Sequence, residues 1–114
     1  MNIELREFPD KLISVLDLAG RFDAYNAGTV REYLHEITDQ PSAQVIVNLS
    51  RVDFIDSMAL ATLVQSLKHC RQKKGDLYLC GLQQPVKIIF ELTRLDKAFK
   101  IFVEEDAAVE AFMD

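Results

Sequence analysis

The sequence has few of the residues on which most enzyme, metal and membrane signatures depend. Its 114 residues include two cysteines, Cys70 and Cys80, which match neither a zinc-binding spacing nor a Cys-x-x-Cys redox motif. We expect both to be buried in a protein from a reducing compartment. The four glycines form neither a phosphate-binding loop nor a dinucleotide-binding fingerprint. No apolar run approaches the ~18 residues of a membrane-spanning helix, and the first residues lack a signal-peptide core. These absences predict a cytoplasmic protein with no membrane insertion.

Basic residues are also scarce relative to acidic ones. The chain has 13 Lys and Arg against 18 Asp and Glu, a net charge of −5, which argues against a broad nucleic-acid-binding face. About half of the residues (49%) are apolar, enough for a hydrophobic core and too many for a disordered chain. Because one core commonly serves about 100–150 residues, we expect residues 1–114 to form one domain.

Hydrophobic periodicity predicts an α/β domain. Alternating or β-branched runs indicate strands at 3–6, 12–19, 45–49, 77–80 and 99–103, and spacing of three and four residues indicates helices at 24–37, 57–72, 85–92 and 106–112. Asp23 is the expected N-cap of the first helix, and residues 50–57 read as a polar loop with an apolar interior. The first two strands form a hairpin, and the later strands are separated by helices. We therefore expect a mixed sheet of four or five strands with helices packed against it.

Catalytic and metal-binding patterns are absent. There is no Gly-x-Ser-x-Gly elbow, and His35 and His69 fall on the outward sides of helices with no second ligand at a suitable spacing. The three-residue spacing of Asp53 and Asp56 in an irregular loop is weak evidence for a metal site. The acidic run Glu104-Glu105-Asp106 is typical of the N-terminus of a helix. The sequence therefore predicts a non-enzymatic protein with no catalytic residue, metal site or cofactor.

Asp56-Ser57 stands out because it lies where a central strand leads into the best-defined helix. In open α/β sheets, functional residues gather beyond the carboxyl ends of parallel strands. Free backbone N–H groups and the helix dipole would accommodate a phosphoryl group on Ser57 without unfolding the helix. The alternative is that Asp56 or Ser57 simply caps the helix.

Three segments carry a resemblance to a known family. They are the strand and loop from Val45 to Ser57, the element Gly20-Arg21-Phe22-Asp23 with Asn26 and Ala27, and the turn Leu92-Thr93-Arg94-Leu95-Asp96 with Phe99 and Ile101. Together they resemble the STAS domain family, specifically the bacterial anti-sigma factor antagonists. The match runs through the whole chain in order, so it implies a STAS-like fold.

The resemblance implies a small, non-enzymatic interaction switch in transcription regulation. In that family the unphosphorylated protein binds an anti-sigma factor, often itself a serine kinase, and so frees the sigma factor. Phosphorylation of the serine after the loop aspartate abolishes binding, and a PP2C-type phosphatase restores it. Carried over to this chain, Ser57 is the phosphoacceptor, and the partner-binding residues are Asp23, Asn26, Asp56, Ser57, Met58 and Ala59.

The chain departs from the family pattern at three positions. Met58 and Ala59 replace a small hydroxyl residue and a glycine, and Asn48 stands where an aspartate is common. Met58-Ala59 favours a second reading, a constitutive STAS adaptor or a cytoplasmic subunit of a lipid-transport complex. A phosphoacceptor receiver domain of similar length would need acidic residues after the first strand, where this chain has Phe8-Pro9-Asp10.

Overall fold

The computed structural model describes all residues from Met1 to Asp114. Its strands are β1 (Asn2–Phe8), β2 (Ile13–Phe22), β3 (Gln44–Ile55), β4 (Asp76–Cys80) and β5 (Ile101–Phe102). Its helices are α1 (Ala27–Thr38), α2 (Ser57–Gln72), α3 (Gln84–Leu92) and α4 (Glu105–Met113), with a short 3₁₀ turn at Leu95–Lys97. No helix combines the length and apolar composition needed to cross a bilayer.

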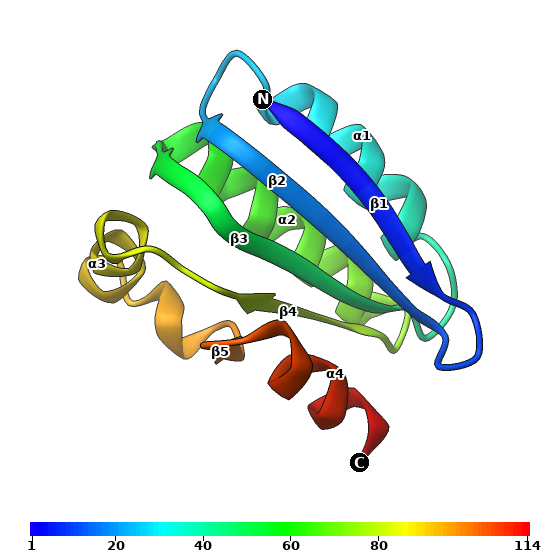
Figure 1. The fold of residues 1–114 in the computed structure, drawn as a ribbon. Helices are drawn as coiled ribbons and strands as arrows, with labels where there is room; N and C mark the ends of the chain where they lie inside the picture. Colours follow the sequence, from blue (N-terminus) through cyan, green and yellow to red (C-terminus); the bar gives the residue numbers. More distant parts are fainter.

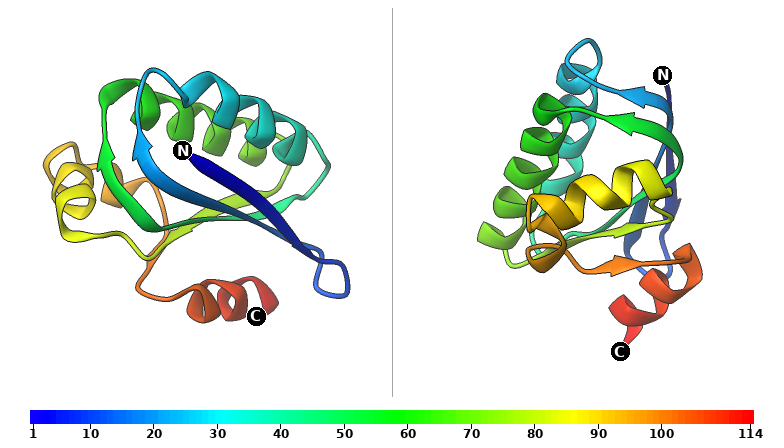
Figure 2. Two further views of the ribbon diagram at one scale, coloured as in Figure 1. Left: turned by 45° about the horizontal axis from the view of Figure 1, so that its top comes forward. Right: turned by 90° about the vertical axis from the view of Figure 1, so that its left-hand side faces the viewer.

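The five strands lie in the sheet in the order of the sequence (Figure 1). The β1–β2 pair is an antiparallel hairpin, and each later neighbour is parallel, joined by a helical crossover. Because such crossovers are right-handed, helices that join successive strands in one direction cover the same face. Figure 2 shows α1 and α2 side by side on one face and α4 on the other. The predicted mixed sheet with an initial hairpin is confirmed.

Each face of the sheet has its own core. Under α1, α2 and α3 lies a cluster of 22 buried residues that includes Leu16 and Leu18. Under α4 lies a smaller cluster of six buried residues that includes Ile13 and Val15. The alternation in β2 thus places its apolar side chains on both faces of the sheet.

Most of the segment expected as a loop at residues 50–57 is instead the second half of β3, which ends at Ile55, and only Asp56 separates it from α2. Val52 and Ile55 are both buried in the main core although they are three residues apart, because the register shift between the Gly20–Val52 and Arg21–Phe54 pairs interrupts the alternation of the strand. It stays paired with β2 across two register shifts, and the last pair is Phe22 with Ile55. The two strands therefore end side by side.

Three element ends also differ from prediction. The first helix begins at Ala27, its N-cap is Asn26, and residue 23 is not its cap. Leu12 lies in the β1–β2 turn with φ of +56° and its side chain 80% exposed, so β2 begins one residue later. The last strand has two residues, and Val103 is 88% exposed beyond it.

A polar network ties α4 to the first three strands. The Arg6 guanidinium donates to both Asp17 and Glu105, and the Asn48 side-chain amide donates to Glu105 at 3.0 Å. Burial opposes ionisation of Glu105, but the hydrogen bonds from Arg6 and Asn48 outweigh it and hold its pKa below the usual value. Its contribution to stability is therefore complete above the unfolded-state pKa and is lost as pH falls through the lower, folded-state pKa.

Replacing Asn48 by aspartate should destabilise the domain. Its Oδ1 accepts from the Ser50 N–H at 2.9 Å, a bond an aspartate could keep, but its Nδ2 bond to Glu105 would become a contact between two carboxylates. We expect Asn48→Asp to lower the free energy of unfolding by about 1–3 kcal/mol at pH 7 in urea titrations. Asn2→Asp, at an exposed site on β1, makes the same charge change and should have little effect. Equal stabilities of the two variants would contradict this account.

Candidate functional site

The candidate site lies where β2 and β3 end side by side. The loop 23–26 connects β2 to α1, and Asp56 connects β3 directly to α2. Because Phe22 pairs with Ile55, the two connections begin at neighbouring positions at the carboxyl edge of the sheet. This is the edge at which ligand- and partner-binding residues of α/β folds usually gather.

The Asp56 side chain joins the two connections. Its Oδ1 accepts from the Ala59 N–H at 3.0 Å, which caps α2, and its Oδ2 accepts from the Ala24 N–H at 2.9 Å. Its backbone N–H donates to the Phe22 carbonyl at 3.2 Å. Asp56 is therefore the N-cap of α2. The same carboxylate also fixes the loop before α1.

Asp23 and Asn26 hold the loop before α1 in one conformation. The Asn26 Oδ1 accepts from the Asp23 N–H at 2.9 Å, and its Nδ2 donates to the Arg21 carbonyl. The Asp23 carboxylate accepts from the Tyr25 N–H at 3.0 Å, so it stabilises the turn rather than the helix end. Asp23 and Asn26 therefore have structural contacts in the loop, and both remain partly accessible to a partner.

Ser57 is the exposed first residue of α2, as predicted. The capping role falls to Asp56, which leaves the Ser57 hydroxyl available at the surface. Met58 is 56% exposed beside it. Ala59, expected as a partner-binding residue, is completely buried in the main core, so its side chain offers no surface to a partner. Only its backbone N–H takes part in the site, through Asp56.

An apolar residue missed by the sequence argument also belongs to this edge. Tyr25 lies in the loop that Asp56 holds and is 99% exposed. Beside it, a groove between the first turns of α1 and α2 is lined by Ala24, Ala27, Gly28, Arg31, Met58, Ala61, Thr62 and Gln65. The groove combines small and apolar side chains with the polar side chains of Arg31, Thr62 and Gln65, and both Tyr25 and Met58 are exposed at this edge. The sequence did not indicate that Tyr25 is exposed, because a single tyrosine in a loop belongs to no periodic pattern of apolar residues.

Charged groups of both signs lie near Ser57. Asp23 and Asp56 flank the connections, and Asp53 is exposed near the end of β3. Basic groups lie at this edge as well: Arg21 lies over the Phe54 ring at 3.8 Å and 3.7 Å from the Asp23 carboxylate, and Arg31 lines the groove together with Met58.

The two thiols do not belong to the site. Cys70 and Cys80 are buried and free, as expected from the sequence. Burial raises the pKa of Cys70 to about 11 and that of Cys80 to about 12, so both remain protonated at neutral pH.

Comparison with known proteins assigns the chain to one family. The STAS domain family model matches residues 2–108, and the chain therefore belongs to the STAS domain family. The chain is 31% identical over 101 residues to the anti-sigma-B factor antagonist of Listeria monocytogenes, covering 89% of this chain and 88% of that protein.

Two solved structures share the fold at lower identity. The anti-sigma factor antagonist SpoIIAA in its unphosphorylated form superposes with a TM-score of 0.81 at 19% identity, covering 96% of this chain and 95% of the other. The Bacillus cell fate determinant SpoIIAA in its phosphorylated form gives a TM-score of 0.74 at 18% identity, covering 96% and 98%. The STAS resemblance seen in the sequence is confirmed.

Removing the Asp56 carboxylate should loosen both connections. Asp56→Ala leaves two backbone N–H groups, those of Ala24 and Ala59, without their acceptor. We expect the free energy of unfolding to fall by about 1–2 kcal/mol, and amide hydrogen exchange to accelerate at both residues. Asp53→Ala removes an exposed acid nearby and should leave both measurements almost unchanged. Faster exchange at Ala59 alone would contradict the joint role of Asp56.

Proposed function

We propose that this chain is an anti-sigma factor antagonist, a non-enzymatic interaction module switched by phosphorylation of Ser57. The observation that carries the proposal is the position of Ser57 as an exposed first residue of α2, held beside the β2–α1 loop by the Asp56 carboxylate. The 31% identity to an anti-sigma-B factor antagonist across 89% of the chain supports the same role.

The helix start can hold a phosphoryl group without losing its own structure. Asp56 already accepts from the Ala59 N–H, and Leu60 donates to the Asp56 carbonyl. The N–H groups of Ser57 and Met58 have no acceptor within the helix, as at any helix start. A phosphate there would meet free N–H donors and the positive end of the dipole. The fold should therefore survive modification.

The same charge would be unfavourable at the interface. A phosphoserine adds about −1.5 to −2 charges next to Met58 and close to Asp56. A partner packed on Tyr25, Met58 and the small-residue groove would have to desolvate the phosphate, and an acidic partner face would also be repelled by it. Phosphorylation is therefore expected to lower affinity while leaving the stability of the domain nearly unchanged.

The partners follow from this role. We propose an anti-sigma factor with serine kinase activity as the binding partner and kinase, and a PP2C-type phosphatase as the activity that restores the free hydroxyl. The whole chain would act as one domain in the cytoplasm, with no cofactor and no contact with nucleic acid.

Substitution of Ser57 tests the switch. Ser57→Asp should weaken binding to the cognate anti-sigma factor by at least about tenfold, or ~1.4 kcal/mol, whereas Ser57→Ala should bind like the wild type and resist phosphorylation. Binding is measured by calorimetry and stability by thermal melting. Unchanged affinity of Ser57→Asp, together with unmodified Ser57 in protein from its native cells, would instead favour a constitutive adaptor.

The exposed apolar surface gives a separate test of the interface. Tyr25→Ser removes a side chain that is 99% exposed, so it should not change the melting temperature but should weaken partner binding by about tenfold or more. Leu92→Ser is the matched control, since Leu92 is 78% exposed at the end of α3. Equal binding by both variants would place the interface elsewhere.

A further inference from the structure

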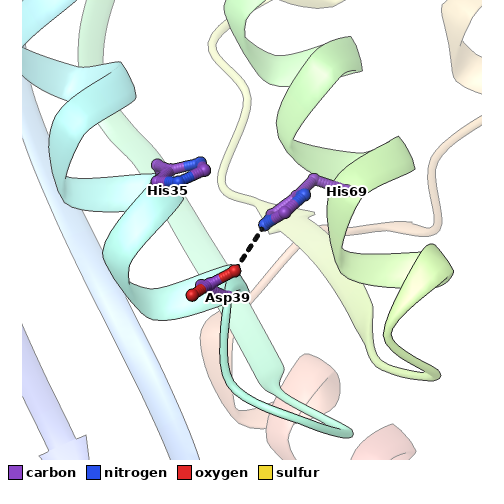
Figure 3. Close-up of side chains that lie close together, drawn as sticks. All are labelled: His35, Asp39 and His69. Carbon is purple, nitrogen blue, oxygen red and sulfur yellow. Dashed lines mark hydrogen bonds and ion pairs between the residues drawn. The ribbon is translucent and has the colours of Figure 1, made fainter.

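Two histidines and an aspartate meet between α1 and α2, at the ends of these helices farthest from Ser57 (Figure 3). His35 and His69 stack with ring centroids 4.8 Å apart and an interplanar angle of 21°. The Nε2 of His69 lies 3.2 Å from Oδ1 of Asp39. The sequence predicts two solvated histidines and no metal site, because the spacing along each helix shows one histidine only.

The fold brings these three side chains together. His35 and Asp39 are four residues apart at the end of α1, so they lie on the same side of the helix. His69 is in the last turn of α2, which runs in the same direction because both helices follow parallel strands. Two neighbouring helix C-termini therefore meet here, and their partial negative charges favour a cation.

From this geometry we propose that His35, Asp39 and His69 form a binding site for a divalent transition-metal ion of the Zn²⁺ type. Imidazole nitrogens with one carboxylate are the ligands that such ions prefer, whereas Mg²⁺ and Ca²⁺ require oxygen ligands. One ligand atom from each residue lies within 4.8 Å of the others. Three protein ligands would leave a coordination position for water or for a side chain of another molecule.

Metal binding requires a small contraction of the cluster. Ligand atoms of a tetrahedral zinc ion with bonds of about 2.0–2.1 Å lie about 3.3 Å apart. His35 and Asp39 are exposed and His69 is partly exposed, so side-chain rotation can shorten the separations without moving the helices. The surrounding groove is open to solvent and lined only by polar and charged residues, which gives an ion free access.

Lys73 competes with a metal for the same carboxylate. Its ammonium lies 3.2 Å from Oδ1 of Asp39, the oxygen that also faces His69. The bound ion would displace this ammonium, and Lys73 is 41% exposed and free to turn into solvent. This competition makes a prediction that a simple surface ion-pair cluster does not make: removal of Lys73 should strengthen metal binding.

Zinc titration of the complete, untagged chain tests the site. Calorimetry with ZnCl₂ should show one ion per chain, and His35→Ala, His69→Ala and Asp39→Asn should each weaken binding by at least about tenfold, since loss of a group that merely supports a ligand already costs that much. Lys73→Met should tighten it. Zn²⁺ should also raise the melting temperature of the wild type but not that of His69→Ala.

Controls separate this site from other zinc ligands. Asp53→Asn makes the same change as Asp39→Asn at a remote, exposed carboxylate and should bind zinc like the wild type. Co²⁺ should give a spectrum without a thiolate charge-transfer band, because Cys70 is buried with its Sγ against the Ala43 carbonyl. Binding that survives loss of both histidines, a thiolate band, or no zinc uptake by the wild type or by Lys73→Met would overturn the proposal.

Discussion

The functional edge depends on one carboxylate that serves two backbone segments. The pairing of Phe22 with Ile55 brings the β2 and β3 ends together, and Asp56 then accepts N–H groups from both the loop before α1 and the first turn of α2. A hydroxyl N-cap could not span both, because it offers one oxygen rather than two. The surface around Ser57 therefore has a fixed shape before any partner arrives, which reduces the ordering cost of binding.

The structure keeps the surface proposed for phosphorylation separate from the elements that hold the domain together. Ser57 and Met58 are exposed, whereas Ala59 and the residues behind it belong to the main core. The polar network of Arg6, Asp17, Asn48 and Glu105 lies under α4, on the opposite face of the sheet. A negative charge added at α2 would thus act on contacts with a partner and leave both cores intact. This separation is what an interaction switch requires.

The sequence was most informative where burial alone decides structure. The alternating apolar pattern of residues 12–19 correctly indicated a strand, and the apolar spacing of residues 57–72 correctly placed α2. The extension of β3 could not be seen, because its hydrogen-bond partners in β2 are more than thirty residues away and two register shifts interrupt the pattern. The meeting of His35 with His69 depends in the same way on how two helices align. The periodicity of a short segment does not predict how that segment aligns with a distant one.

The strand order has a consequence for how the chain assembles. Every strand lies beside its neighbour in the sequence, so the sheet can grow one strand at a time from the β1–β2 hairpin as the polypeptide leaves the ribosome. The contact between Arg6 and Glu105 differs from these pairings between neighbouring strands, since it joins residues 99 positions apart. It can form only when α4 has been synthesised. This ion pair therefore joins the first strand to the last helix.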